Sequence, residues 1–388
     1  MLAKNRSVLS PLWMWPRAAY IHVPFCAHHC GYCDFPIATA QDHLIELYLD
    51  ALAAELSTLG EPQPVRTLFL GGGTPTHLSA GQLERLLSTI LRWLPLRAEN
   101  ETEFSIECNP DTLTADKIAV LADHGVNRVS LGAQSFHADL LRVLERAHDP
   151  AEIGRAVERV RRRIENVSLD LIFGVPGQTP TQWRADVDRA LSLAPDHLST
   201  YGLTYEKGTP LWKRRQHGQV RPLDEDAELS LYALAIDVLE SAGFEHYEIS
   251  SFARPDRRCR HNQVYWANEA YFGFGMGAAR YVLGRRELNT RDLQRYIRQA
   301  LSCESVIWQS EELSAEERAC ETMAVQLRRA EGIDRVAFHA QTGFDLDALA
   351  GDALARHVEQ GLLADDGRSV CLTRHGKYVA DAVIERLL

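Results

Sequence analysis

Short apolar segments alternate with helical patterns between Ala18 and Leu203, and this order constrains the fold more than any other feature. Strands that alternate with helices predict βα units and a parallel sheet. We therefore predict an α/β protein whose main body is a partial (β/α)6 barrel, open on one side. The expected strands are Ala18–Val23, Arg66–Leu70, Glu103–Cys108, Asn127–Leu131, Asn166–Phe173 and His197–Leu203.

Glycines and polar side chains gather where these segments end. Gly71-Gly72-Gly73-Thr74-Pro75 follows the second expected strand, and glycines let a backbone approach a ligand closely. In parallel α/β folds, the carboxyl ends of the strands carry the site. We expect the site there, although a Gly-rich turn can also be a simple tight βα connection.

Two carboxylates, Glu107 and Asp170, lie in otherwise apolar strands. We expect Asp170 to point into the barrel, where a buried carboxylate needs a partner. A cationic ligand would be one partner. Arg146 is the other candidate, in an internal salt bridge, or it could bind a carboxylate of a ligand.

Three cysteines, Cys26, Cys30 and Cys33, form a C-x3-C-x2-C pattern directly after the first strand. Four cysteines usually hold a cubane iron–sulfur cluster, so three would leave one iron open to another ligand. Zinc, with help from His28 or His29, is the alternative. Structural zinc sites usually close with a second cysteine pair, and the other five cysteines are scattered, so we favour a cluster.

Composition excludes several classes of protein. A net charge of −11 argues against a broad nucleic-acid interface. The scattered cysteines do not resemble a disulfide framework and fit a reducing compartment. No apolar run approaches the roughly 18 residues that a membrane span needs, and prolines interrupt the N-terminal segment, which argues against a signal peptide. We therefore expect a cytoplasmic protein.

A second motif, His261-Asn262-Gln263-Val264-Tyr265-Trp266, precedes a region rich in glycine and aromatic residues. Neutral imidazole is a good axial ligand for heme iron, and aromatic rings can stack on a porphyrin. Packing of His261 within the core is the alternative.

The domain limits follow from these patterns. We expect a tail at 1–17, the barrel and the His261 region at 18–290, a linker near Asn289–Ser302, and a C-terminal domain at 303–388. Its order of helices and a hairpin is that of a small winged-helix-like module. Its acidic character favours a lid or packing role over DNA binding.

Together these motifs resemble the family of oxygen-independent coproporphyrinogen III oxidase-like radical SAM proteins, where SAM is S-adenosylmethionine. The similarity runs from Ala18 to the C-terminus, and the motif H-N-x-x-Y-W resembles the mark of a heme chaperone branch. The resemblance implies a [4Fe-4S] cluster on Cys26, Cys30 and Cys33, and heme contact by His261. It also implies SAM contacts by Tyr20, Gly72, Gly73, Thr74, Glu107, Gln134, Arg146 and Asp170.

Departures from the oxidases affect the expected function. The oxidases have a fourth cysteine where this chain has Phe35, and a longer arm than the 19 residues before Tyr20. Ala279 stands where many relatives have a histidine. We therefore favour a heme chaperone that delivers heme to a respiratory or membrane hemoprotein and can form a homodimer. The alternatives are a radical SAM enzyme, such as a dehydrogenase of coproporphyrinogen III or a methylase, and a zinc protein without redox chemistry.

Overall fold

The computed structural model describes residues 12–97 and 102–388, so residues 1–11 of the expected tail lie outside the described residues. Its main body is a 12-stranded sheet in the order β14-β13-β12-β11-β1-β4-β5-β6-β7-β8-β10-β9. These strands are β1 (Ala18–Val23), β4 (Thr67–Gly72), β5 (Glu103–Cys108), β6 (Arg128–Gln134), β7 (Asn166–Phe173), β8 (His197–Gly202), β9 (Glu245–His246), β10 (Ser251–Ala253), β11 (Tyr271–Phe274), β12 (Ala279–Val282), β13 (Arg285–Asn289) and β14 (Ile307–Glu312).

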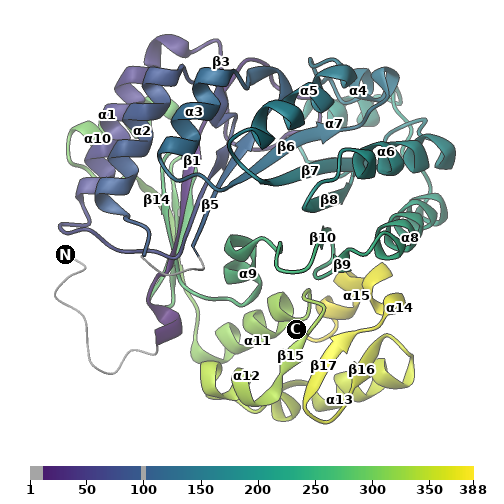
Figure 1. Ribbon diagram of the computed structural model, residues 1–388. Coiled ribbons are helices and arrows are strands. Elements are labelled where there is room, and N and C mark those ends of the chain that lie inside the picture. Colours follow the sequence, from purple (N-terminus) through teal and green to yellow (C-terminus); the bar gives the residue numbers. More distant parts are fainter. Residues whose placement is uncertain (1–11, 98–101) are drawn as a thin grey trace.

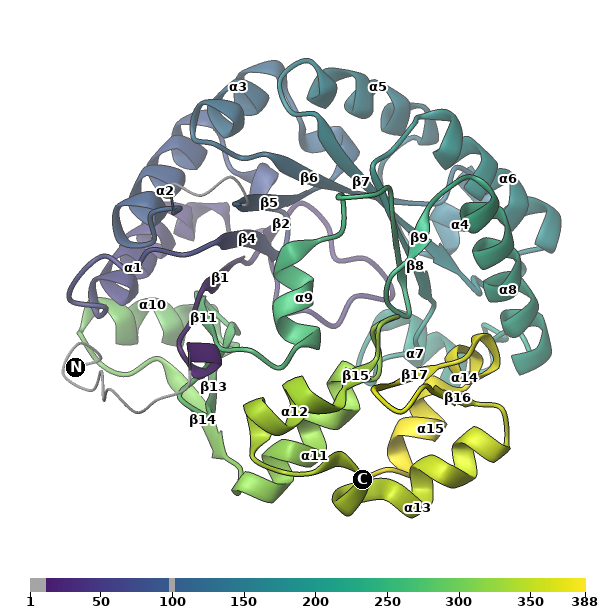
Figure 2. The same ribbon diagram turned by 60° about the horizontal axis from the view of Figure 1, so that its bottom comes forward.

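The predicted partial barrel is confirmed. Strands β1, β4, β5, β6, β7 and β8 run parallel in that order. Helices lie outside the arc that these strands form, and α9 lies on its concave side (Figure 2). The helices of this body are α1 (Ile45–Ser57), α2 (Ala80–Trp93), α3 (Ala115–Asp123), α4 (Ala138–Val143), α5 (Pro150–Arg161), α6 (Pro180–Ser192), α7 (Pro210–Gln216), α8 (Glu225–Ser241), α9 (Arg260–Trp266) and α10 (Leu293–Leu301).

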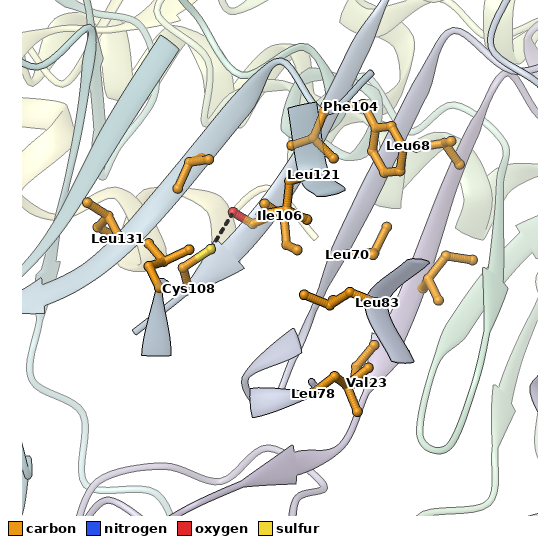
Figure 3. Close-up of a cluster of buried hydrophobic side chains, with 14 of the residues drawn as sticks. Val23, Leu68, Leu70, Leu78, Leu83, Phe104, Ile106, Cys108, Leu121 and Leu131 are labelled. Atoms are coloured by element: carbon orange, nitrogen blue, oxygen red, sulfur yellow. Dashed lines mark hydrogen bonds between the residues drawn. The ribbon is translucent and has the colours of Figure 1, made fainter. Parts of the chain in front are cut away.

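Period-two alternation within the parallel strands separates the core from the site. Residues such as Ile106 in β5 and Leu131 in β6 point outward into one hydrophobic cluster beneath the helices (Figure 3). Their neighbours Glu107 and Ser130 point inward and line cavities. Because successive side chains of a strand face opposite ways, each strand both builds the core and presents polar groups to the interior.

The sheet continues beyond the barrel strands on both sides. On one side β11 pairs in parallel with β1, and β12, β13 and β14 follow as antiparallel strands. On the other side β10 and β9 continue antiparallel from β8. The carboxylate of Glu55 in α1 accepts hydrogen bonds from the Gly275 amide and from Asn289 Nδ2, which ties the β11–β13 region to the barrel.

The segment that we expected to be a linker, Asn289–Ser302, is part of the main body, and that expectation was wrong. Helix α10 occupies most of it and packs against α1, with Leu293 and Tyr296 buried. Its apolar residues recur at helical spacing, which gives the segment a buried face. β14, within the range that we assigned to the C-terminal domain, pairs with β13.

The C-terminal module has its own hydrophobic cluster, which begins at Ala319. Its order of helix, strand, two helices and hairpin agrees with the predicted winged-helix-like module, and it lies beside β9, β10 and α9 (Figure 1). Its three-stranded sheet has the order β15-β17-β16. The elements are α11 (Ala315–Gln326), β15 (Ile333–Asp334), α12 (Arg335–Thr342), α13 (Leu346–Glu359), β16 (Leu363–Asp365), β17 (Ser369–Leu372), α14 (Arg374–Tyr378) and α15 (Ala380–Glu385).

Candidate functional site

Two adjoining cavities open into the concave side of the barrel. The first has a volume of about 470 Å³ and contains Cys26, Cys30 and Cys33 in its wall. The second has a volume of about 590 Å³ and contains His261 in its wall. Both volumes are typical of small-molecule sites. The cavities adjoin because their walls share Phe35, Gly72, Glu107, Ser130, Asp170 and Tyr201.

The cysteine loop leaves β1 and is anchored by the short parallel pair β2 (Phe25–Cys26) and β3 (Ala38–Thr39). Cys26 Sγ lies 3.4 Å from Thr74 Oγ1, and Arg146 Nη1 donates to Cys30 Sγ over 3.4 Å. Burial raises the pKa of Cys26 to about 11 and that of Cys33 to about 12. A metal that binds here therefore displaces protons from buried thiols.

Within the described ranges, no three His, Cys, Asp or Glu side chains lie close enough to share a single metal ion. A cubane cluster differs, because each thiolate binds a different iron. Three thiols that line one cavity beside a guanidinium and a hydroxyl fit that donor set. The Arg146 charge favours thiolates and the negative charge that they bring.

The three glycines at the end of β4, Gly71 and Gly72 within it and Gly73 directly after it, are required by close packing. A Cβ atom at Gly72, whose φ is +106°, would lie 2.3 Å from His22 Cε1. At Gly71 it would lie 2.6 Å from Glu107 Oε2, and at Gly73 2.6 Å from the Pro24 carbonyl oxygen. The turn therefore holds β1, β4 and β5 together at the mouth of the first cavity.

The predicted SAM-contacting residues gather at the first cavity, with one exception. Tyr20 lies on the wall of the second cavity, where its hydroxyl contacts His22 Nδ1 over 3.1 Å. The others line the first cavity: Gly72, Gly73, Thr74, Glu107, Gln134, Arg146 and Asp170. Gln134 adopts a φ of 62°, a conformation that costs a residue other than glycine about 1–3 kcal/mol.

Arg146 and Asp170 do not form the salt bridge that we considered. Arg146 Nη2 donates to Asn109 Oδ1 and to the Gly132 carbonyl, each over 2.8 Å. Asp170 accepts from Ser130 Oγ over 3.1 Å, and it points into the barrel as predicted. Burial raises the pKa of Asp170, and burial and the charge of Asp170 raise that of Glu107 to about 7. These carboxyls suit a cationic ligand.

His261 lies in the wall of the second cavity and is also packed within the core. It is 0 % exposed, its ring stacks on Phe69 at 5.2 Å, and burial lowers its pKa to about 3. Thr67 Oγ1 lies 2.9 Å from its Nδ1, and Tyr265 Oη lies 2.7 Å from its Nε2. The imidazole is neutral, and Nε2 can reach a metal only after Tyr265 rotates away.

Sequence analysis missed two residues that fix these positions. His22, whose Nε2 contacts the Pro36 carbonyl over 2.8 Å, is buried beneath Gly72. Its position two residues after Tyr20 in β1 is the signal that could have identified it. Glu103 accepts hydrogen bonds from the amides of Arg260 and His261 and so holds the start of α9 against β5, a contact that sequence alone does not reveal.

Two departures noted in the sequence lie at the cavity walls. Phe35 is 57 % exposed and borders both cavities. Ala279, on β12, lines the second cavity. No helix within 12–97 and 102–388 has the length and hydropathy to span a bilayer.

Comparison with known proteins identifies the families that this sequence and this fold resemble. The model of the radical SAM superfamily matches residues 20–190, and that of the HemN C-terminal domain matches residues 313–379. The coproporphyrinogen III oxidase HemN from Escherichia coli, a radical SAM enzyme, has the same fold, with a TM-score of 0.85 and 24% identity over 100% of this chain and 93% of that one. The fold and the three-cysteine cavity thus define a radical SAM protein with a HemN-type C-terminal domain.

Curated relatives show which branch of the radical SAM proteins this chain resembles. The heme chaperone HemW of Bacillus subtilis is 37% identical over 96% of this chain and 99% of its own length. HemW of Lactococcus lactis is 36% identical over 96% and 97%, and HemW of Escherichia coli is 33% identical over 96% and 98%. The chain belongs to the HemW family, as its resemblance to the heme chaperone branch predicts.

Proposed function

We propose that this protein is a heme chaperone that holds a [4Fe-4S] cluster and SAM in the first cavity and heme in the second. The observation that carries the proposal is the pair of adjoining cavities, one with three cysteines and one with His261. Cys26, Cys30 and Cys33 would hold the cluster, and the amino and carboxylate groups of SAM would bind its open iron. Membership in a radical SAM family favours this cluster over zinc.

The walls of the first cavity suit SAM. Glu107 and Asp170 offer carboxyl groups to a sulfonium or an amino group, and Arg146 offers a guanidinium to a carboxylate. The glycine turn leaves backbone close to a ligand. When bound, the cluster would supply electrons, while these side chains orient SAM beside it.

The second cavity suits a planar aromatic ligand. Its wall is rich in rings, which can stack on a porphyrin face. Its wall includes Glu321 and Val325 of α11, so the C-terminal module would border a ligand there, in keeping with the predicted lid role. These rings belong to Tyr20, Phe35, Phe69, Tyr201, Tyr265, Trp266 and Tyr271.

The test begins with anaerobic reconstitution and analysis of iron and sulfide. We expect wild type to contain both, and Cys30→Ser to lose most of both. Zinc without sulfide in wild type would overturn the cluster. Heme titration followed by visible absorption then compares wild type, His261→Ala and the control His246→Ala.

His246 matches His261 in burial and stacking but lies away from both cavities. It stacks on Phe252 at 4.2 Å, and burial lowers its pKa to about 3. We expect weaker heme binding and an altered heme spectrum in His261→Ala only. Equal loss in both variants would remove His261 as a heme contact, and no saturable binding by wild type would overturn the heme chaperone.

The partner we propose is a hemoprotein, respiratory or membrane-associated, that accepts the heme in the cytoplasm. All eight cysteines are unbridged, in keeping with a reducing compartment. Delivery is tested by mixing the heme-loaded protein with an apo-cytochrome in vesicles and measuring, by visible absorption, how much heme moves to the cytochrome. Sedimentation with and without heme tests the proposed homodimer.

The adjoining walls also favour a second candidate, a radical SAM enzyme. A ligand in the second cavity would lie next to SAM in the first, because Glu107, Asp170 and Tyr201 border both. Formation of 5′-deoxyadenosine that depends on an added tetrapyrrole would support this activity. Its absence across a broad panel of tetrapyrroles would argue against it.

A further inference from the structure

Arg128 is a buried cation in the wall of the second cavity, and its Nε and Nη1 find no hydrogen-bond acceptor among the described residues. It is the first residue of β6, is 2 % exposed, and shares the inward face with Ser130. Throughout the described part of the chain, its guanidinium forms no hydrogen bond or ion pair, and Nε and Nη1 are buried without any acceptor. Buried N–H donors that lack acceptors are costly, so Arg128 needs an explanation.

The nearby acids are already engaged. Glu103 accepts hydrogen bonds from the amides of Arg260 and His261 and from Ser105 Oγ, and Asp170 accepts from Ser130 Oγ. Burial alone would lower the pKa of Arg128, but the surrounding Cys259, Glu103, Tyr247 and Asp170 hold it above its ordinary value. The guanidinium is therefore charged, yet its donors remain free.

Arg128 and His261 belong to one electrostatic neighbourhood. After burial, the charge of Arg128 is the cause that lowers the pKa of His261. The other arginine of this cavity, Arg286, differs because it pairs with Glu321. Of the two arginines that line this cavity in the described part of the chain, Arg128 has donors without acceptors, and Arg286 is paired.

We propose that Arg128 anchors a carboxylate of the ligand in the second cavity, which for heme is a propionate. This inference rests on the proposed function. A guanidinium matches a carboxylate in shape and charge, and the aromatic wall receives a planar ring. A buried cation beside stacked rings thus recognises a flat anionic ligand. SAM also has a carboxylate, so the experiment distinguishes the two sources.

The experiment titrates the reconstituted full-length protein with iron protoporphyrin IX and, separately, with its dimethyl ester, which lacks the carboxylate charge. A charged hydrogen bond is worth about 10–100-fold in affinity, so wild type should prefer the free acid by about that factor. Arg128→Gln should lose this preference, and Arg128→Lys should retain part of it. SAM affinity should be the same in wild type and both variants.

Arg286→Gln serves as the matched variant from the same cavity and should keep the preference. Circular dichroism checks that each variant is folded, and the comparison of acid with ester in wild type needs no variant at all. Equal affinity of wild type for acid and ester would overturn the inference while leaving heme binding intact. So would a preference that survives in Arg128→Gln, one that is lost only in Arg286→Gln, or a loss of SAM affinity alone in Arg128→Gln. If wild type binds neither porphyrin, it is the proposed function that fails.

Discussion

Gly72→Ala should destabilise the protein more than an alanine at Gly60, a glycine with positive φ and open surroundings. Gly72 has a φ of +106°, and a Cβ atom there would lie 2.3 Å from Cε1 of His22. The imidazole has little room to move, because the Tyr20 hydroxyl contacts Nδ1 and the Pro36 carbonyl contacts Nε2. Two costs therefore add at this position.

The matched control is Gly60→Ala. Gly60 has a φ of +75°, but no heavy atom lies within 4 Å of a Cβ atom there. Backbone strain should cost each variant about 1–3 kcal/mol, and overpacking should cost Gly72→Ala about 1–3 kcal/mol more. We expect the difference between the two variants to be about 2 kcal/mol in the free energy of unfolding.

Urea unfolding of the cluster-free protein, followed by tryptophan fluorescence, measures both variants. The double variant Gly72→Ala with His22→Ala removes the ring and should recover most of the overpacking cost relative to His22→Ala alone. Equal stability of the two single variants, or no recovery in the double variant, would refute the proposed contact. Failure of Gly72→Ala alone to fold would agree with it.

Other predictions concern buried charges. His261 has a folded pKa of about 3 because it is buried, against 6.5 as its ordinary value, so its contribution to stability is lost as pH falls through this window. The pH dependence of unfolding should therefore be shallower for His261→Gln, by up to about 1.4 kcal/mol per pH unit, and an unchanged slope would contradict this. The pH dependence of the Glu107 contribution has the opposite sign. Burial and the charge of Asp170 raise its pKa from the ordinary 4.5 to about 7, so its contribution to stability is fully present below pH 4.5 and is lost as the pH rises through 7. The melting temperature of Glu107→Gln relative to wild type should be higher at pH 8 than at pH 5. The same difference between variant and wild type at both pH values would contradict this prediction. Glu103→Gln should cost about 1–2 kcal/mol in urea unfolding and weaken heme binding, since the carboxylate holds the amides at the start of α9, and full stability would exclude that role.

The parallel strands could be predicted from sequence because each places apolar residues between two helical segments. β1, β5 and β7 have the bounds that the pattern indicated. The strands β12, β13 and β14 could not, because β12 has only four residues, and β13 and β14 are rich in charged residues such as Arg285 and Glu311, with no apolar alternation to mark them. They belong to the sheet through pairing with β11, which is not a local property.

In the site, too, local motifs could be predicted from the sequence, and contacts between distant residues could not. The cysteine loop and the glycine turn are local motifs, and the cavity that contains them was predicted. The placement of His261 depends on Thr67 and Glu103, which are far from it in the sequence. Tyr20 stays a predicted SAM contact, and its side chain lines the neighbouring cavity, where its hydroxyl contacts His22.

The shared wall between the cavities bears on both proposed functions. Glu107 and Asp170 border the cysteine cavity and the His261 cavity, and their pKa values are raised by burial. A cation in the first cavity would favour their ionised forms, and an anion in the second would oppose ionisation. Occupancy of one cavity therefore changes the electrostatic field in the other, and linkage makes this effect reciprocal. Under the proposed function, SAM in the first cavity would in this way regulate how tightly an anionic tetrapyrrole is held in the second, even where SAM is not consumed.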